Sequence, residues 1–214
     1  MDRSRIAIII PAYNESTTIG NVVCLASLYG VPWVVDDGSS DSTGQIALNA
    51  GARVVIHASN RGYDQALNSG FAAAYANGCD AFVTLDADGQ HNPDLLPQII
   101  DLLDEGAEVV IGVRSRQARL AEHIFAFFTR LRYGIDDPLC GLKAYRASVY
   151  EAHGHFDSYG SIGTELALSA ASSRLRLEQV PFEVRNRADT PRFGLAFRAN
   201  LRILRSLVLS LLHG

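Results

Sequence analysis

The chain has 214 residues, of which 48% are hydrophobic and 20% are charged. This composition excludes a wholly disordered chain, and the length favours one domain with its own core. The formal net charge is −4, which argues against a nucleic-acid partner because general nucleic-acid binders are usually basic. Cys24, Cys79 and Cys140 show no CxxC spacing, which indicates a reducing compartment and no cysteine-based zinc site.

Short apolar runs alternate with helical patterns through the first half of the chain. The expected strands span residues 6–10, 32–35, 53–57, 81–85 and 108–113. The expected helices span residues 19–28, 42–50 and 65–77, and a fourth begins at Pro93, since proline favours the first helical turn. The fold class is therefore predicted to be α/β, a Rossmann-like single domain with a mostly parallel central sheet and flanking helices.

The second half of the chain is less regular. Helices are expected over residues 118–133, 161–173 and 196–212, strands over 142–145 and 176–184, and a polar loop over 186–194. We expect a domain of residues 1–194 followed by a C-terminal amphipathic helix of residues 195–214. Arginines flank the apolar stripe of that helix, so it either packs on the core or a partner subunit, or lies at a membrane interface.

The expected location of the protein follows from two missing patterns. No run reaches about 18 apolar residues, the length that a membrane-spanning helix needs. The N-terminal residues carry no signal-peptide pattern. We therefore expect a cytoplasmic protein, either free or peripheral on the inner face of the cell membrane.

Polar and glycine-containing clusters follow each expected strand. In a mostly parallel sheet, ligands bind beyond the carboxyl ends of the strands. Five loops would therefore line one crevice. These loops contain Tyr13-Asn14-Glu15, Asp36-Asp37-Gly38-Ser39, Asn60-Arg61-Gly62, Asp86-Ala87-Asp88 and Gly112-Val113-Arg114.

Asp86, Asp88 and Gln90 form the central cluster of the expected crevice. Oxygen ligands at alternating positions suit Mg²⁺ or Mn²⁺, with further positions left for water and a substrate phosphate. The alternative is a pair of turn-forming aspartates that cap the helix at Pro93. The chain has no GxGxxG and no GxxxxGK[ST] pattern, so the signatures of dinucleotide-binding and P-loop proteins are missing.

Three motifs together resemble the family 2 glycosyltransferases, and within them the dolichol-phosphate mannosyltransferase and polyprenyl-phosphate glycosyltransferase branch. The motifs are Ile10-Pro11-Ala12-Tyr13-Asn14-Glu15, Asp36-Asp37-Gly38-Ser39-Ser40-Asp41 and Asp86-Ala87-Asp88-Gly89-Gln90-His91. The resemblance covers about residues 5–190. It implies a GT-A fold and an inverting, metal-dependent hexosyltransferase that uses a GDP- or UDP-linked sugar.

The resemblance also implies roles for single residues. Pro11, Tyr13 and Glu15 would contact the nucleotide, and Asp37 would lie by the base or ribose. Asp86 and Asp88 match the DxD-like pair of the family, so both would bind the metal. Asp86 would also contact the nucleotide sugar, and Asp88 would take part in catalysis. Gln90 matches a third metal contact.

The acceptor decides the remaining chemistry. A polyprenyl phosphate is already ionised, so it needs cations that position it. The candidate cations are Arg114, which we also count as catalytic, and Arg116, Arg130, Arg132 and Lys143. A hydroxyl acceptor would need a general base instead, and Asp137 is the best candidate because it matches a family aspartate.

Other functions fit parts of the pattern. The protein could be a soluble glycosyltransferase for a small hydroxyl compound or a cell-surface glycan. It could also be a non-catalytic subunit that binds a nucleotide sugar, as a homo-oligomer or with a membrane partner. A nucleotidyltransferase is a further alternative, although its glycine-rich basic N-terminal loop is missing.

Overall fold

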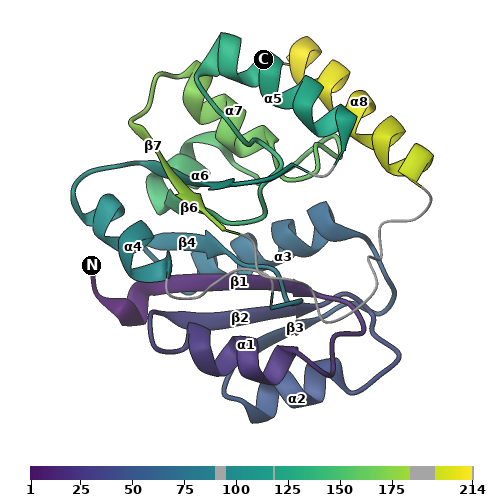
Figure 1. The fold of residues 1–214 in the computed structure, drawn as a ribbon. Coiled ribbons are helices and arrows are strands. Elements are labelled where there is room, and N and C mark those ends of the chain that lie inside the picture. The colour runs from purple at the N-terminus through teal and green to yellow at the C-terminus, as the bar shows by residue number, and fades with distance from the viewer. Residues whose placement is uncertain (90–94, 118, 184–195, 214) are drawn as a thin grey trace.

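The computed structural model describes residues 1–89, 95–117, 119–183 and 196–213 (Figure 1). A short 3-10 helix spans Arg3–Arg5. The strands are β1 Ile6–Ala12, β2 Val31–Asp36, β3 Arg53–Ile56, β4 Ala81–Thr84, β5 Val109–Arg114, β6 Lys143–Arg146 and β7 Leu177–Phe182. The helices are α1 Ile19–Ala26, α2 Thr43–Asn49, α3 Tyr63–Ala76, α4 Leu96–Asp104, α5 Leu120–Tyr133, α6 Ala147–His153, α7 Glu165–Ser172 and α8 Ala196–His213.

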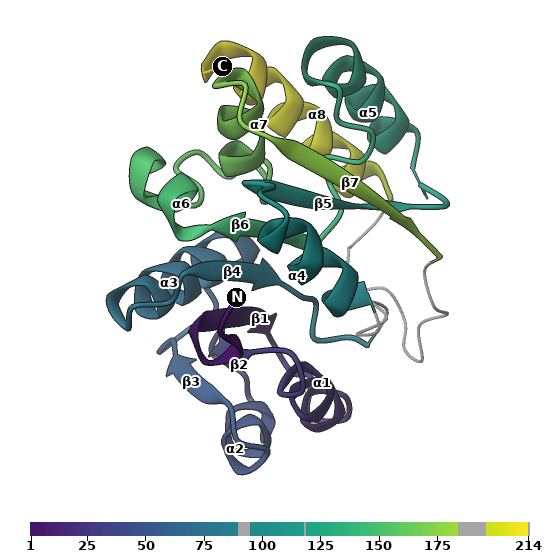
Figure 2. The same ribbon diagram turned by 90° about the vertical axis from the view of Figure 1, so that its left-hand side faces the viewer.

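The strands of the described residues form one sheet in the order β3-β2-β1-β4-β6-β5-β7. All neighbours are parallel except β6, which runs antiparallel to both β4 and β5. The predicted mostly parallel α/β sheet is therefore confirmed. Figure 2 shows the sheet between its two helical layers.

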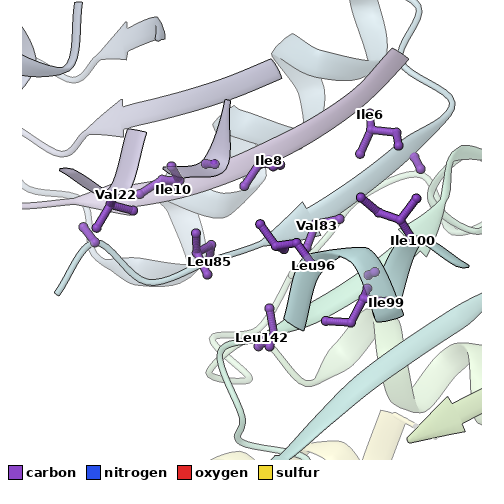
Figure 3. Packing of buried hydrophobic residues seen from close by; sticks show 14 of the residues in the cluster. Ile6, Ile8, Ile10, Val22, Val83, Leu85, Leu96, Ile99, Ile100 and Leu142 are labelled. Atoms are coloured by element: carbon purple, nitrogen blue, oxygen red, sulfur yellow. The ribbon is translucent and has the colours of Figure 1, made fainter. Parts of the chain in front are cut away.

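The sheet is buried on both faces because successive side chains of a strand point to opposite sides. The even-numbered residues of β1, such as Ile8, pack under α1, α2 and α4, together with Val83 and Leu96 (Figure 3). The odd-numbered Ala7 and Ile9 belong to a second cluster with α3, α5, α6, α7 and α8. Continuous apolar runs thus become central strands, as expected for a sheet that is covered on both sides.

One helix boundary and one whole helix differ from the expectation. The helix predicted over 161–173 starts only at Glu165, because Ile162 (φ 58°) and Gly163 (φ 68°) take the left-handed conformation. Helix α6 was not predicted as a helix. Pro93 and the loop over 186–194 lie outside the described residues.

Helices α5 and α8 pack together on the side of the sheet that α3 also covers (Figure 1). Helix α8 buries Ile203 and Leu207 in the second cluster, and Ala199 is buried as well, while Leu201 and Leu212 stay exposed. The helix is thus amphipathic, with one face on the protein. Among the described residues, no helix combines the length and the apolar character that crossing a bilayer requires.

Close packing of α3 on the sheet depends on Gly70. A Cβ at this position would lie 2.5 Å from Ile9 Cγ2 and 3.1 Å from Val35 Cγ2. We expect Gly70→Ala to lower the free energy of unfolding by about 1–2 kcal/mol, because overpacking outweighs the gain in helix propensity. Urea denaturation would measure the change.

Gly20→Ala in α1 is the matched control. Its Cβ would meet only the end of the Ile46 side chain, at 3.2 Å. We expect a change within about 1 kcal/mol for this variant. A Gly70→Ala protein at least as stable as the native chain would contradict the packing argument.

Candidate functional site

Most of the predicted site residues lie at one edge of the sheet, the edge formed by the carboxyl ends of its parallel strands. The loops after the parallel strands β1, β2, β4 and β5 meet at this edge, as parallel strands require. The antiparallel β6 adds its beginning to the same edge, because Lys143 pairs with Thr84 at the end of β4. Thr84 Oγ1 donates a hydrogen bond to the Gly141 carbonyl at 2.6 Å. The segment before β6 therefore lies beside Asp86.

The loops after β1 and β2 are joined into one wall. The Asn14 amide donates to Ser39 Oγ at 2.9 Å, and the Ser40 amide donates to Asn14 Oδ1 at 2.8 Å. The Glu15 amide donates to Thr43 Oγ1 at 2.7 Å, and Glu15 is buried. This network holds the segment that contains the predicted nucleotide contacts.

The predicted nucleotide contacts Pro11, Tyr13 and Glu15 differ in exposure. Tyr13 is 41% exposed, and Pro11 at the end of β1 is partly exposed. The buried Glu15 accepts a hydrogen bond from Thr18 Oγ1 at 3.2 Å. Tyr13 therefore presents the largest surface of the three to a ligand, whereas Glu15 belongs to the frame of the loop.

Asp37 holds the loop of residues 60–62 in place. Its Oδ1 lies 2.6 Å from His57 Nδ1 and accepts the Arg61 amide at 2.9 Å, and its Oδ2 accepts the Gly62 amide at 2.8 Å. His57 Nε2 is 2.9 Å from Ser69 Oγ. When Nδ1 carries the imidazole proton, the Ser69 hydroxyl donates to Nε2. Both Asp37 oxygens are thus engaged within the protein, and the prediction that Asp37 meets a base or ribose stays a prediction.

Asp86 and Asp88 follow β4 and are partly exposed. The Asp86 carboxylate lies against the backbone of Gly141, where a Cβ would come within 2.4 Å of Oδ2. Only glycine at position 141 therefore leaves room for the Asp86 carboxylate. Two carboxylates two residues apart, with access from outside, fit the oxygen donor set of a divalent cation. Gln90 lies outside the described residues.

The partly buried Arg114 forms an ion pair with the buried Asp137. Arg114 Nε and Nη2 donate to the two Asp137 oxygens at 2.7 and 2.8 Å, and the Arg114 amide donates to Oδ2 at 3.1 Å. Burial alone would lower the pKa of Arg114, but the hydrogen bonds that Arg114 donates to Asp137 and the negative charge of Asp137 raise it above its usual value. Arg114 Nη2 also lies 3.3 Å from Glu122 Oε2.

This ion pair affects the roles predicted for Asp137, as a general base, and for Arg114, as a cation for the acceptor. Asp137 is 1% exposed, and its two oxygens accept hydrogen bonds from Arg114, so as a base it would have to act within this pair. Breaking a buried pair by removing one partner typically costs about 3–5 kcal/mol. The Asp137 carboxylate therefore holds the Arg114 side chain at the end of β5.

The other predicted acceptor cations differ in their burial and in the groups that they contact. Lys143 is buried, its Nζ donates to the Gly163 carbonyl at 2.7 Å, and burial lowers its pKa to about 8. Arg130 Nε lies 2.5 Å from Asp136 Oδ1, and the guanidinium of Arg132 lies 5.4 Å from the Tyr133 ring centroid. Both belong to the last turn of α5.

Arg116 is exposed in the loop that follows β5. Near it, an open pocket of about 370 Å³ lies at the ends of β5 and β7. Its lining residues are Val113, Arg114, Ser115, Pro181, Phe182 and Glu183. Of the predicted acceptor cations, Arg114 lines this pocket, and the exposed Arg116 follows it by two residues in the chain.

Tyr63 and Asp64 lie beside the site but were not among the residues predicted to form it. Burial, followed by the charges of Asp86 and Asp64, raises the pKa of Tyr63. Asp64 Oδ1 accepts the Gly163 amide at 2.7 Å. Burial and the nearby Asp157 charge raise the pKa of Asp64 to about 6. The signal in the sequence was their position directly after Asn60-Arg61-Gly62, one of the five expected loops of the crevice.

Comparison with known proteins gives one family match. The family model described as "Glycosyl transferase family 2" matches residues 7–120. An undecaprenyl-phosphate 4-deoxy-4-formamido-L-arabinose transferase from Enterobacter sp. is 32% identical over 173 residues, which are 71% of this chain and 51% of that protein. A polyprenol monophosphomannose synthase from Mycolicibacterium smegmatis is 34% identical over 170 residues, covering 69% of this chain and 63% of the relative. The chain thus spans about half to two thirds of the length of these relatives.

A solved structure is also similar. Glucosyl-3-phosphoglycerate synthase from Mycobacterium tuberculosis, crystallised with Mn²⁺ and uridine-diphosphate-glucose, matches with a TM-score of 0.73 and 25% identity. The match covers 96% of this chain and 79% of that chain. The expected GT-A architecture agrees with this likeness.

Asp64 generates a pH-dependent prediction. Its folded-state pKa of about 6 exceeds the unfolded value of about 3.9, so folding favours the protonated form. The native chain should therefore lose up to about 2–3 kcal/mol of stability from this group as pH rises from 4 to 6. Asp64→Asn keeps an acceptor for the Gly163 amide and removes the charge.

We expect Asp64→Asn to be more stable than the native chain at pH 8, with the difference vanishing near pH 4. Urea denaturation at several pH values measures both curves. Glu151→Gln, at an exposed position of α6, is the control for a change of one charge. A native-minus-variant difference that stays constant from pH 4 to 8 would show that Asp64 does not titrate in this range.

Proposed function

Since the chain belongs to glycosyl transferase family 2, we propose that it transfers a sugar from a nucleotide diphosphate sugar to a polyprenyl phosphate, with inversion at the anomeric carbon. The observation that carries this proposal is the meeting of Asp86, Asp88 and Gly141 with the loops after β1, β2 and β5 at one sheet edge. The relatives act on undecaprenyl or polyprenol phosphates according to their names.

The donor would lie between the wall of the first two loops and the Asp86–Asp88 segment. Tyr13 offers exposed aromatic surface on that wall, which suits contact with a nucleotide. Asp37 would act through the loop of residues 60–62, which it holds with two backbone hydrogen bonds. Pro11 and Glu15 would shape the same wall.

Asp86 and Asp88 would hold a divalent cation, Mg²⁺ or Mn²⁺. The cation would stabilise the negative charge of the departing nucleoside diphosphate as a Lewis acid. The neighbour crystallised with Mn²⁺ and uridine-diphosphate-glucose supports this assignment. Gln90 would add a third ligand.

The hydrogen bonds that Asp137 accepts favour a phosphate acceptor over a hydroxyl acceptor. A phosphate oxygen is already ionised and needs no general base, whereas a hydroxyl does. Both Asp137 oxygens accept hydrogen bonds from Arg114, which opposes a role as a base. Arg116 would bind the acceptor phosphate, and the Arg114–Asp137 pair would position the loop that carries it.

The acceptor lipid implies peripheral association with the inner face of the cell membrane. Exposed apolar side chains occur on both packed helices: Leu120, Phe127, Phe128 and Leu131 on α5, and Leu201, Leu204, Val208, Leu211 and Leu212 on α8. We call this set the α5–α8 apolar face. The exposed Arg130, Arg202 and Arg205 lie among these residues in the sequence, and arginines suit anionic headgroups.

Nucleotide binding tests the donor assignment. We expect titration calorimetry to detect GDP or UDP binding that depends on Mn²⁺ and is lost in Asp88→Ala. Sugar transfer to a short polyprenyl phosphate should fall about 10²- to 10³-fold in this variant, because a main source of charge stabilisation is removed. Asp101→Ala, at an exposed position of α4, removes one carboxylate elsewhere and should leave binding intact.

The absence of binding by either nucleotide would count against the transferase assignment, and binding without turnover would favour a non-catalytic subunit. Asp137→Asn separates the acceptors. Partial transfer by a folded variant fits a phosphate acceptor, while complete loss without loss of stability would favour a hydroxyl acceptor and a base.

Vesicle flotation tests the membrane assignment. We expect the native chain to float with vesicles that contain phosphatidylglycerol, and the double variant Phe127→Glu, Leu131→Glu to stay unbound. Both side chains are more than 60% exposed, so the folded core should tolerate the change. Burying apolar side chains in the interface supplies the binding energy that the two charges would remove.

The control double variant is Leu28→Glu, Leu48→Glu. It adds the same charge at exposed leucines near the ends of α1 and α2, on the opposite face of the sheet. Equal flotation of both double variants would show that the α5–α8 apolar face does not contact the bilayer.

A further inference from the structure

Two histidines and a glutamate converge where α6 ends and α7 begins (Figures 1 and 2 show these helices). His153 is the last residue of α6, His155 follows in the connecting loop, and Glu165 is the first residue of α7. Their ligand atoms all lie within 4.8 Å of one another. None of the three belongs to the candidate active site.

The two imidazoles point the same nitrogen at the same oxygen. His155 Nε2 lies 2.8 Å and His153 Nε2 lies 3.4 Å from Glu165 Oε1. The ring centroids are 4.3 Å apart. An ion pair with Glu165 needs only one histidine, and two protonated rings this close would repel each other. A cation between the three atoms accounts for the convergence of both rings.

The spacing of the three atoms suits a transition metal. Ligands about 2.0–2.1 Å from a tetrahedral Zn²⁺ lie about 3.3 Å from one another. The 3.4 Å separation of His153 Nε2 and Glu165 Oε1 is at this value, and the 2.8 Å separation of His155 requires a small outward shift. The side chain of His155 is 41% exposed, which leaves access for an ion and a water ligand.

A second set of hydrogen bonds orients two of the ligands. Ser169 Oγ lies 3.0 Å from His153 Nδ1, which leaves Nε2 as the nitrogen that faces the cluster. The Ser158 amide and hydroxyl donate to Glu165 at 2.6 and 2.8 Å. Such outer partners fix the ring and carboxylate orientation at metal sites.

We propose that His153, His155 and Glu165 bind a transition-metal ion, Zn²⁺ or a close relative such as Co²⁺, as a clamp between α6 and α7. Two imidazoles and one carboxylate are a known donor set for these ions. The site is separate from the divalent cation that Asp86 and Asp88 would hold. It does not depend on the function proposed above.

The clamp would close the loop of residues 154–164 at both ends. This loop reaches the candidate active site, because the Gly163 carbonyl accepts Lys143 Nζ and the Gly163 amide donates to Asp64. Asn68 of α3 holds its middle, accepting the Phe156 and Asp157 amides at 3.0 and 3.1 Å. The role assigned to the ion is therefore structural.

Metal-free chain titrated with Zn²⁺ tests the proposal directly. In the Asp88→Ala background, which removes the other divalent-cation site, we expect one ion per chain, a higher midpoint of thermal unfolding with Zn²⁺, and visible absorption of the Co²⁺ form at intensities typical of a four-coordinate site. His155→Ala should weaken binding by at least about 100-fold, since it removes a ligand rather than an outer partner. Ser169→Ala should weaken binding about 10- to 100-fold.

Two matched controls locate the ion. His123→Ala removes an exposed histidine of α5, and Asp88→Ala removes a carboxylate of the other site, so the histidine cluster should keep its native affinity for Zn²⁺ in both variants. The exposure of His155 makes His155→Ala the variant that leaves the core intact, which circular dichroism would verify. In the Asp88→Ala background, Zn²⁺ binding that persists after His153→Ala and His155→Ala in a folded protein would overturn the proposal, as would no Zn²⁺ binding by the native chain.

Discussion

A carboxylate buried at the edge of an apolar sheet must accept hydrogen bonds that the fold supplies, because removing its charge from water is otherwise very costly. Three loops of this molecule are built around such a group. Asp37 gathers the amides of residues 61 and 62, Asp137 gathers Arg114, and Asp157 accepts the Gly160 and Ser161 amides at 2.6 and 2.7 Å. Each carboxylate thereby determines the course of a loop that borders the candidate active site.

Asp86 and Asp88 differ from these framework carboxylates in their access to solvent. Asp37 is 4% and Asp137 is 1% exposed, whereas Asp86 and Asp88 are partly exposed and follow the end of β4. Gly141 keeps the space beside Asp86 clear. The sheet edge thus separates two kinds of acid, one that organises backbone and one that is accessible to a ligand.

Most strands of the sheet and the loops of the candidate site could be predicted from the sequence, because continuous apolar runs and the polar clusters after them are local patterns. It did not show that β6 is antiparallel, since strand direction follows from tertiary pairing. Nor did it separate the framework acid Asp37 from Asp86, because both follow a strand in similar motifs. The convergence of His153, His155 and Glu165 was equally hidden, since it depends on how a loop with left-handed residues at 162 and 163 returns to α7.

The place of β6 in the sheet has a consequence for how the chain folds. Strands β4 and β5 are parallel and come first in the sequence, yet β6 lies between them. Two strand spacings, about 10 Å in all, must therefore stay open until the later strand arrives. The residue of β6 that pairs with Thr84 is Lys143, which lies 59 residues further along the chain. Until then β4 and β5 present open edges that can pair with other chains, so insertion of β6 closes two ladders in one non-local and comparatively slow step.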